Sequence, residues 1–463
     1  MNSQNLQISE WPIPQASPSY SKNLFKRTSE NKIFPTNTST TNVNQNEKSL
    51  SQNTFITNQT FFPIVLGVLL GTLTSGLVLS VVTTVWLTSS TQTSTTTVST
   101  IAGTSITRNV SFSFIKISYK QCKTFSQKWT ITGTLNNARY YHTASVLTNG
   151  QVLITGGQSI NGNLSSAELY DSSTGMWTAT GSMNYARYYH TASLLTNGKI
   201  LVTGGLGSSG ILSSAELYTS STAAWTVTGS MNYTRYYHTA SVLTNGTVLV
   251  TGGQIGGTFT HSTELYNPST GSWTTGNNMI YARGYHTACV LTNGKVLVIG
   301  GYTGSNGYMT STELYDPSTG VWTTNGTLNY GRRYHTTSLL NNGQVLVTGG
   351  QSTNGYLNSA ELYDPSTGIW TVTGNMNYVR YYHTATLLTN GKVLVTGGLS
   401  NSSSYLNTAE LYDSSTGTWT ITVSMNYSRY YHTASLLTNG NVLVTGGYVT
   451  SGNYLNISEL YQP

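Results

Sequence analysis

A tetrapeptide of the form Arg-x-Tyr-His recurs seven times in this chain of 463 residues. Its histidines are His142, His190, His238, His286, His335, His383 and His432, and each directly follows a tyrosine. Imidazole nitrogens bind metal ions and transfer protons near neutral pH, and phenol oxygens can act beside them. Seven imidazoles facing one axis would form a ring able to hold a metal or another ligand.

The repetition of the motif favours a structural role over that ring. Groups that perform different chemical tasks need different environments, whereas this motif is nearly the same in every copy. We expect Tyr and His to fill equivalent pockets between repeats, with their polar tips hydrogen-bonded to backbone. The metal or ligand ring is the alternative, and we assign no catalytic residue and no metal ligand from the sequence.

Arginines and glutamates recur in step with the histidines. The arginines are Arg139, Arg187, Arg235, Arg283, Arg332, Arg380 and Arg429, and the glutamates are Glu168, Glu216, Glu264, Glu313, Glu361, Glu410 and Glu459. Equal numbers at fixed spacing predict repeated ion pairs or strand-end contacts. The glutamates share one local sequence, so they do not offer the two unlike carboxyl environments of an acid–base pair.

The copies differ mainly in short segments that each follow a Gly-Gly pair. These segments mix Asn, Ser and Gly with aromatic residues, a composition typical of adaptable binding surfaces. We predict a ligand-binding rim from Phe259, His261, Tyr302, Tyr308, Tyr356, Tyr405, Tyr448 and Tyr454. The alternative is that these loops only pack on one another.

The elements that carry these residues are short strands. The Gly-Gly pairs begin at residues 156, 204, 252, 300, 349, 397 and 446, a period of 48 or 49, which indicates a solenoid or propeller. Each unit contains four strand signals, at 188–195, 199–203, 215–218 and 225–228 in the second unit, and none has helical periodicity. Asn197-Gly198 between the first two predicts a tight type I′ hairpin.

This order of strands, Gly-Gly, Glu-Leu-Tyr and Trp resembles the kelch repeat, and residues 138–158, ARYYHTASVLTNGQVLITGGQ, look most like kelch repeats of the galactose-oxidase type. The resemblance covers 129–463 and implies an all-β, seven-bladed propeller over 128–463. The region begins with a lone Trp129 strand and stops after the seventh Glu-Leu-Tyr. Pairing Trp129 with residues 459–461 would complete the last blade and close the ring.

The same resemblance raises the question of copper. In galactose oxidase and its relatives, a Tyr-His pair of one repeat ligates copper together with a further His and a Tyr cross-linked to Cys. We expect no C-terminal domain to supply the further His, and neither Cys122 nor Cys289 is an obvious partner for a motif tyrosine, since Cys289 lies about 13 Å along the strand from Tyr285. We therefore predict no cofactor, with a copper oxidase as the alternative.

The N-terminal part predicts a membrane anchor. Residues 61–87 carry no charge and are long enough to span a bilayer as a helix. Lysines and arginines precede this segment, which predicts a disordered cytoplasmic tail at 1–60 and an extracellular C-terminal part. Residues 88–127 begin as a Ser/Thr-rich stalk and linker, eight Asn-x-Ser/Thr acceptors follow the span, and Gly67, Gly71 and Ser75 form a stripe that would suit a homodimer.

Charge decides which partners to expect. Only 8% of residues are charged and the formal net charge is +7, but from Trp129 onward eleven basic residues face eleven acidic ones. That balance gives no reason to expect nucleic acid. We predict a membrane-anchored extracellular propeller that binds a glycan or protein ligand without catalysis, with a galactose-oxidase-like copper oxidase or a cytoplasmic interaction scaffold as alternatives.

Overall fold

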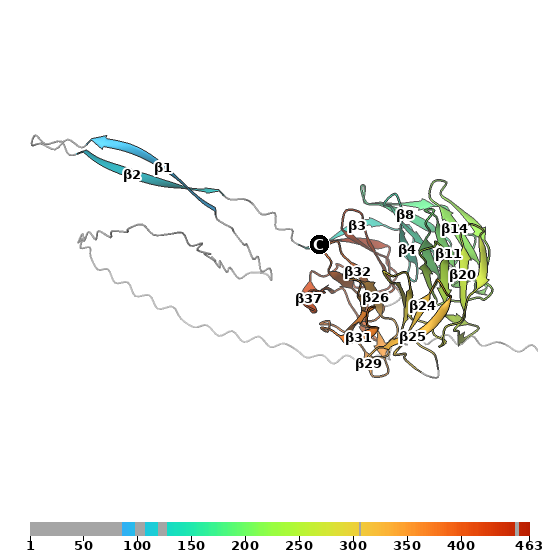
Figure 1. The fold of residues 1–463 in the computed structure, drawn as a ribbon. Coiled ribbons are helices and arrows are strands. Elements are labelled where there is room, and N and C mark those ends of the chain that lie inside the picture. The colour runs from blue at the N-terminus through green and yellow to red at the C-terminus, as the bar shows by residue number, and fades with distance from the viewer. Residues whose placement is uncertain (1–85, 98–106, 119–126, 305–306, 450–452) are drawn as a thin grey trace, which may run out of the picture. The chain divides into compact units, whose positions relative to one another are not determined.

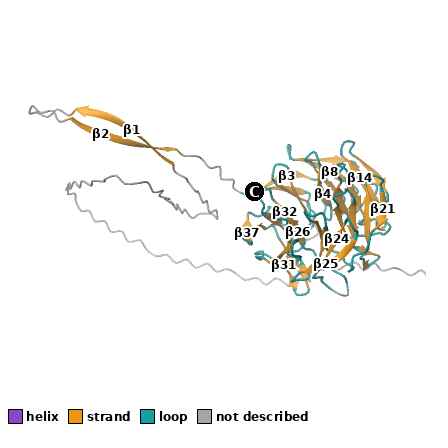
Figure 2. Ribbon diagram, viewed as in Figure 1, coloured by secondary structure: helices purple, strands orange, loops and turns teal. Residues whose placement is uncertain are grey.

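The computed structural model describes residues 86–97, 107–118, 127–304, 307–449 and 453–463. Every regular element in these ranges is a β-strand (Figure 2). The predicted tail, residues 61–85 of the predicted span, and Cys122 lie outside them. Within the described ranges, no helix is long and apolar enough to cross a membrane.

The stretch expected to be a stalk contains a two-stranded hairpin. Strand β1 (Trp86–Thr97) pairs antiparallel with β2 (Thr107–Ser118). Trp86 and Leu87, predicted as the end of the apolar helix, are the first residues of β1, and residues 88–97 of the predicted stalk continue this strand. The physical reason is that threonine is β-branched and fits a pleated strand well.

Residues 128–463 form a seven-bladed propeller, and each blade is a four-stranded antiparallel sheet (Figure 1). Blades 1 to 3 consist of β4 (Thr143–Val146), β5 (Val152–Thr155), β8 (Ala167–Asp171) and β9 (Met176–Thr180); β10 (Thr191–Leu194), β11 (Ile200–Thr203), β14 (Ala215–Thr219) and β15 (Ala224–Thr228); and β16 (Thr239–Val242), β17 (Val248–Thr251), β20 (Thr263–Asn267) and β21 (Ser272–Thr275). Blades 4 and 5 consist of β22 (Thr287–Val290), β23 (Val296–Ile299), β24 (Ser311–Asp316) and β25 (Val321–Thr327); and β26 (Thr336–Leu339), β27 (Val345–Thr348), β30 (Ala360–Asp364) and β31 (Ile369–Val372). Blades 6 and 7 consist of β32 (Thr384–Leu387), β33 (Val393–Thr396), β36 (Ala409–Asp413) and β37 (Thr418–Thr422); and β38 (Thr433–Leu436), β39 (Val442–Thr445), β40 (Ile457–Gln462) and β3 (Lys128–Thr134).

The loops between the second and third strands of five blades carry small hairpins of their own. These are β6 (Gln158–Ser159) with β7 (Gly162–Asn163), β12 (Leu206–Gly207) with β13 (Gly210–Ile211), β18 (Gln254–Ile255) with β19 (Thr258–Phe259), β28 (Gln351–Ser352) with β29 (Gly355–Tyr356), and β34 (Leu399–Asn401) with β35 (Ser404–Tyr405). The loops are therefore ordered by backbone pairing and not only by side-chain packing.

The ring closes through strand β3, which is the outer strand of blade 7. Trp129 lies opposite Tyr461 and Ile131 opposite Glu459 in the antiparallel register with β40, and the C-terminus lies beside β3 (Figure 1). The Trp129 indole N–H donates to the Val423 carbonyl at 2.8 Å. The first and last strands of the propeller thus share one sheet, which removes both open edges.

Two details of the blades differ from the sequence prediction. The first strand of blade 2 begins at Thr191 and not at residue 188, because Tyr189 has φ +54°, which interrupts the extended backbone. The turn at Asn197-Gly198 is not type I′, since only Gly198 has a positive φ and its N–H donates to the Leu195 carbonyl. This is the longer hairpin loop in which a type I turn is followed by a left-handed glycine.

The hydrophobic core lies between the blades. Seven buried clusters each join side chains of two neighbouring blades, and the cluster between blades 7 and 1 includes Leu443, Val152 and Trp177. The second strand of every blade is buried along its whole length. Each blade therefore buries its core side chains against both of its neighbours.

We expect removal of β3 to destabilise the propeller. A chain beginning at Leu135 lacks the Trp129 contacts and exposes the edge of β40, so it should lose on the order of 3 kcal/mol or more and self-associate. Urea unfolding and size-exclusion chromatography would measure both effects. The control is a chain beginning at Thr124, which keeps β3. Equal stability and a monomeric state for both chains would contradict closure by β3.

Candidate ligand-binding face

The propeller has two faces that differ in their connections. The linker face holds the loop between the second and third strands of each blade and the segment that enters the blade from the one before it, which are 252–262 and 229–238 for blade 3. The turn face holds the tight turns, which are 243–247 and 267–271 for blade 3. The Arg-x-Tyr-His motifs and the predicted aromatic rim all lie on the linker face.

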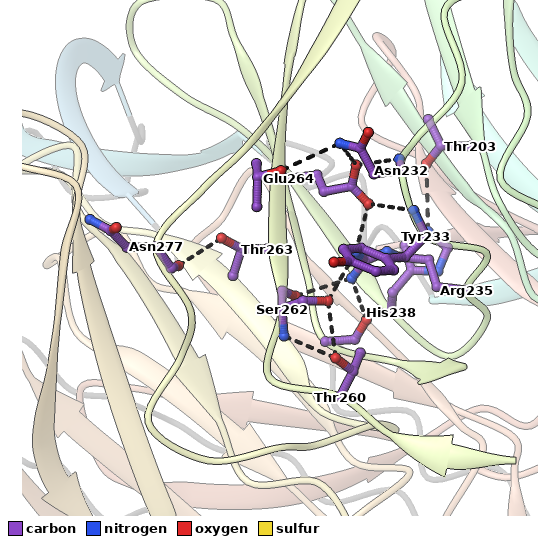
Figure 3. A network of polar contacts seen from close by, with 12 residues as sticks. Thr203, Asn232, Tyr233, Arg235, His238, Thr260, Ser262, Thr263, Glu264 and Asn277 are labelled. Atoms are coloured by element: carbon purple, nitrogen blue, oxygen red, sulfur yellow. Dashed lines mark hydrogen bonds and ion pairs between the residues drawn. The ribbon is translucent and has the colours of Figure 1, made fainter. Parts of the chain in front are cut away.

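Each blade contains one buried ion pair just beneath the linker face. In blade 3, Arg235 Nη2 lies 2.8 Å from Glu264 Oε1, and both side chains are completely buried. Arg235 Nη1 donates to the carbonyls of Gly252 and Ser262 at 2.9 and 3.1 Å (Figure 3). The guanidinium therefore connects the segment that enters the blade to the third strand and to the Gly-Gly pair.

The pair is present in all seven blades. The Nη2–Oε1 distances are 2.8 Å for Arg139–Glu168, 2.9 Å for Arg187–Glu216, 2.8 Å for Arg235–Glu264, 2.6 Å for Arg283–Glu313, 2.6 Å for Arg332–Glu361, 2.8 Å for Arg380–Glu410 and 2.7 Å for Arg429–Glu459. Burial lowers the pKa of each arginine below its ordinary value, and the partner carboxylate opposes that shift. The predicted ion pairs are present, and their carboxylates are occupied by partners.

The same carboxylate also holds the segment that arrives from the preceding blade. Glu264 Oε2 accepts from the backbone N–H of Asn232 at 2.6 Å and from its side-chain amide at 3.0 Å. Glu264 Oε1 accepts from the N–H of Tyr233 at 3.2 Å (Figure 3). One glutamate thus fixes the position of an Asn-Tyr dipeptide on the linker face.

The motif tyrosines form a closed ring around the propeller axis. Neighbouring ring centroids are 3.9 Å apart for Tyr141–Tyr189, 4.2 Å for Tyr189–Tyr237, 4.0 Å for Tyr237–Tyr285, 4.7 Å for Tyr285–Tyr334, 4.1 Å for Tyr334–Tyr382, 4.0 Å for Tyr382–Tyr431 and 4.0 Å for Tyr431–Tyr141. All seven have φ between 53° and 58°, a left-handed conformation that costs a non-glycine residue about 1–2 kcal/mol. Burial raises the pKa of these phenols above the usual value, so they remain neutral donors and acceptors.

The motif histidines lie between the blades and not around the axis. His238 Nε2 is 3.1 Å from Thr191 Oγ1 and 3.5 Å from Thr203 Oγ1, both in the preceding blade. The imidazole tips therefore contact threonine hydroxyls, whereas the sequence predicted backbone partners for them. Within the described residues, the Nδ1 atoms of the seven motif histidines are buried without a hydrogen-bond partner.

The Gly-Gly pairs allow this close approach. A Cβ on Gly204 would lie 2.6 Å from the Arg235 carbonyl oxygen and 2.8 Å from His238 Cε1, and Gly204 has φ +62°. A side chain at this position would separate blade 2 from blade 3, which explains why glycine stands there.

Most of the predicted rim residues pack against the next blade at the x position of Arg-x-Tyr-His. Tyr356 stacks on Tyr381 at 4.5 Å and 7°, and Tyr405 lies 5.4 Å from Tyr430. In the last blade, Tyr448 and Tyr454 lie 5.6 and 5.0 Å from Tyr140. His261 is exposed and its carbonyl accepts from the N–H of Met279. These eight residues do not form one cluster, and their role in binding stays a prediction.

The sevenfold pattern is broken at blades 4 and 5, where the x position is Gly284 and Arg333 instead of tyrosine. The Phe259 ring occupies the space beside Gly284, since a Cβ there would be 2.8 Å from Phe259 Cδ1. The Arg333 guanidinium lies 4.5 Å from the Tyr302 ring centroid and 5.1 Å from that of Tyr308. Sequence analysis selected Phe259, Tyr302 and Tyr308 but not the arginine that Tyr302 and Tyr308 contact.

A second set of aromatic residues was missed by the sequence analysis. They precede the motif arginine by two positions and are 37–47% exposed: Tyr185, Tyr233, Tyr281, Tyr330, Tyr378 and Tyr427. Blade 1 has Asn137 instead. The available signal was an Asn-Tyr or Ile-Tyr dipeptide repeated outside any strand.

An open groove of about 320 Å³ lies beside one of these tyrosines. The residues that surround it are Ser165, Asn184, Tyr185, Ala186, Gly207, Ser208, Ser209 and Leu212.

Free charges gather on the turn face. Of the described residues from 128 onward, the lysines and aspartates are Lys128, Lys199, Lys295, Lys392, Asp171, Asp316, Asp364 and Asp413, and all lie beside tight turns or at the matching end of β3. Two exposed pairs form there, Lys295–Asp316 and Lys392–Asp413. Among the described residues from 128 onward, the linker face carries one charged side chain besides the seven buried Arg–Glu pairs. This side chain is Arg333, which is 7% exposed. The linker face is therefore aromatic and polar but almost uncharged.

Two of the predicted glycosylation acceptors have a structural role. The amide nitrogens of Asn232 and Asn426 donate to the buried Glu264 and Glu459. A glycan on either nitrogen would break that contact. By contrast, Asn245 and Asn401 are exposed.

The residues present do not fit a copper site of the kind the sequence resemblance implied. Among the described residues, no group of three or more His, Cys, Asp or Glu side chains could hold a metal ion. Each motif histidine turns its Nε2 towards a threonine of the neighbouring blade. The Cys289 thiol donates to the Val290 carbonyl and packs against the hydrophobic cluster between blades 4 and 5, and burial raises its pKa to about 11.

Comparison with known proteins identifies the class first. A kelch motif matches residues 187–232, so the protein is a seven-bladed kelch β-propeller. Propellers of this class are usually protein-interaction modules. The Attractin/LZTR1 beta-propeller family matches residues 212–451, more than half of the chain, and the chain belongs to this family. No curated protein matches it.

One similar solved structure is a "novel fungal alcohol oxidase with catalytic diversity among the AA5 family, in complex with copper". The TM-score is 0.60 at 20% sequence identity, and the match covers 73% of this chain and 76% of that one. At this identity the similarity concerns the fold alone.

We expect substitutions in a buried pair to destabilise the protein strongly. Glu264→Gln leaves the Arg235 charge buried without its partner, so the free energy of unfolding should fall by about 3–5 kcal/mol. Urea denaturation followed by tryptophan fluorescence would measure it. Lys295→Met, which removes a solvent-exposed pair, is the control and should leave the midpoint nearly unchanged. Similar midpoints for the two variants would contradict the importance of the buried pair.

The histidines predict acid sensitivity. Burial and the neighbouring arginine charges lower the pKa of His142, His238 and His383 to about 3 and hold the pKa of the other four well below the usual value. The unfolded chain binds protons below about pH 6.5 while the folded chain does not, so stability is full above that pH and falls as the pH drops towards 3. Urea midpoints at pH 7.5 and 5.0 test this. A midpoint that does not move would refute it.

Proposed function

We propose that this protein is a membrane-anchored extracellular kelch propeller that binds a glycan or protein ligand through its linker face, without catalysis. One observation carries the binding role: exposed tyrosines, amides and hydroxyls share a face from which free charges are almost absent. Tyrosine gives a large and rigid contact area at low entropic cost. The carboxylates and histidines of the motifs have internal partners, so they do not supply an acid–base pair.

The extracellular location rests on the sequence of the N-terminal region. An uncharged segment at 61–87 follows a basic tail, and a Ser/Thr-rich segment comes next. These features favour a signal anchor with the propeller outside the cell.

Full-length protein made in eukaryotic cells should show a gel shift on N-glycosidase treatment, and protease added to intact cells should cleave it. Asn401→Gln should reduce the shift, because this acceptor is exposed. An unchanged gel position together with complete protection would place the propeller in the cytoplasm and favour an interaction scaffold.

Binding is tested with the full chain displayed on cells, probed with a glycan array and with cell-surface proteins. A ligand of the linker face should bind more weakly after combined Tyr281→Ala and Tyr330→Ala substitution and with unchanged affinity after combined Lys295→Ala and Asp316→Ala substitution on the turn face. If neither a glycan of the array nor a cell-surface protein binds the chain, the proposed function is contradicted.

A further inference from the structure

The six exposed tyrosines of the linker face lie beside the buried arginines, and the Arg380 guanidinium is 5.6 Å from the centroid of the Tyr378 ring. The tyrosines are Tyr185, Tyr233, Tyr281, Tyr330, Tyr378 and Tyr427, and their side chains are 37–47% exposed. Blade 1 closes into the same ring with Asn137 in this position. An aromatic side chain is therefore not required there for folding.

Each of these tyrosines is held in the same way. The backbone N–H donates to Oε1 of the buried glutamate in its blade, at 3.1 Å for Tyr185 and Tyr281 and at 3.2 Å for the other four. The glutamate is itself fixed by its arginine. The fold thus presents six copies of one preorganised aromatic platform, at intervals of one blade, around one face.

The groove around Tyr185 shows what such a platform offers. Its lining combines the tyrosine ring and Leu212 with the amide of Asn184 and the hydroxyls of Ser208 and Ser209. It is an open surface groove with a volume of about 320 Å³. An apolar ring face beside neutral hydrogen-bonding groups is complementary to a sugar ring, which has apolar C–H faces and hydroxyl edges.

We propose that the six tyrosines are equivalent subsites for a neutral glycan, and that a repeating glycan chain or cluster occupies several of them at once. The inference rests on the proposed function, because it uses the same linker face. Free charges lie on the opposite face and Arg333 is enclosed by tyrosines, so an acidic or basic ligand finds no exposed counter-charge. A protein ligand would usually depend on one central group of anchors, whereas six tyrosines held in the same way, one in each of six blades, suit a ligand that repeats.

The test uses the full chain and four probes: immobilised mannan, galactan and β-1,3-glucan, with heparin as the anionic comparison. We expect at least one neutral polysaccharide to bind with an apparent affinity about 10²–10⁴ times that of its monosaccharide, through multivalency. Tyr185→Ala should weaken binding only about two- to threefold. The triple variant Tyr185→Ala, Tyr281→Ala, Tyr378→Ala should weaken it about 8- to 27-fold, the product of three such effects.

Two matched variants sharpen the result. Asn137→Tyr supplies the platform missing from blade 1 and should strengthen polysaccharide binding. Met176→Ala with Ile369→Ala, two exposed apolar residues on outer strands, should leave it unchanged. Thermal unfolding of every variant checks the fold, which these exposed substitutions should preserve.

Binding to heparin alone, or neutral-glycan binding that survives the triple substitution, would overturn the inference. If the triple variant instead loses a protein ligand whose binding resists deglycosylation, the inference fails while the proposed function stands. If the unmodified chain binds none of the polysaccharides and no surface protein, both fail.

Discussion

The arrangement of the whole linker face depends on one interaction, the buried Arg–Glu pair beneath it. In water-free surroundings neither ion is tolerated alone, so the chain must bring both into each blade together with donors and acceptors for the remaining atoms. The arginine donates hydrogen bonds to two backbone carbonyls, and in blade 3 one of them belongs to Gly252. The glutamate accepts hydrogen bonds from backbone N–H groups of the incoming segment. Folding of a blade and attachment of its neighbour are therefore one event.

The left-handed tyrosines are held in place by that framework. Their conformation is unfavourable for residues with a side chain, yet it recurs in all seven blades. The segment before each tyrosine is fixed by the glutamate, and the histidine after it is inserted between blades. The backbone conformation between these two anchors is restricted, and the phenol points towards the neighbouring motif tyrosines around the axis.

Sequence reasoning identified the parts of the structure that repetition makes visible. The Gly-Gly period and the Trp and Glu-Leu-Tyr strands predicted seven four-stranded blades, and the equal numbers of Arg and Glu predicted the ion pairs. It did not predict which side chain of the Tyr-His dipeptide reaches the axis, because that depends on a positive φ at Tyr189 and its equivalents. The predicted type of turn at Asn197-Gly198 was wrong for a similar reason, since this dipeptide is compatible with hairpin loops of more than one length.

The candidate site was harder to predict because local composition does not report what packs against a side chain. Tyr356 and Tyr405 look like exposed loop residues, but each lies against a tyrosine of the following blade. Tyr185 and its equivalents look like linker residues, and only the three-dimensional position of Glu216 shows that they are presented outwards. The isolated Arg333 attracts notice only when its position is compared with the six other copies.

Closure through β3 also has a consequence for biosynthesis. The residues of β3, which ends at Thr134, leave the ribosome before any blade is made, whereas their partner β40 begins only at Ile457. At roughly 5–20 residues per second, the first strand waits between roughly 15 and 70 s for the last. During that interval both edges are open, and an unpaired strand rich in Thr, Trp and Ile is exposed to other nascent chains. A cell that makes this protein must keep that strand soluble until β40 has been made.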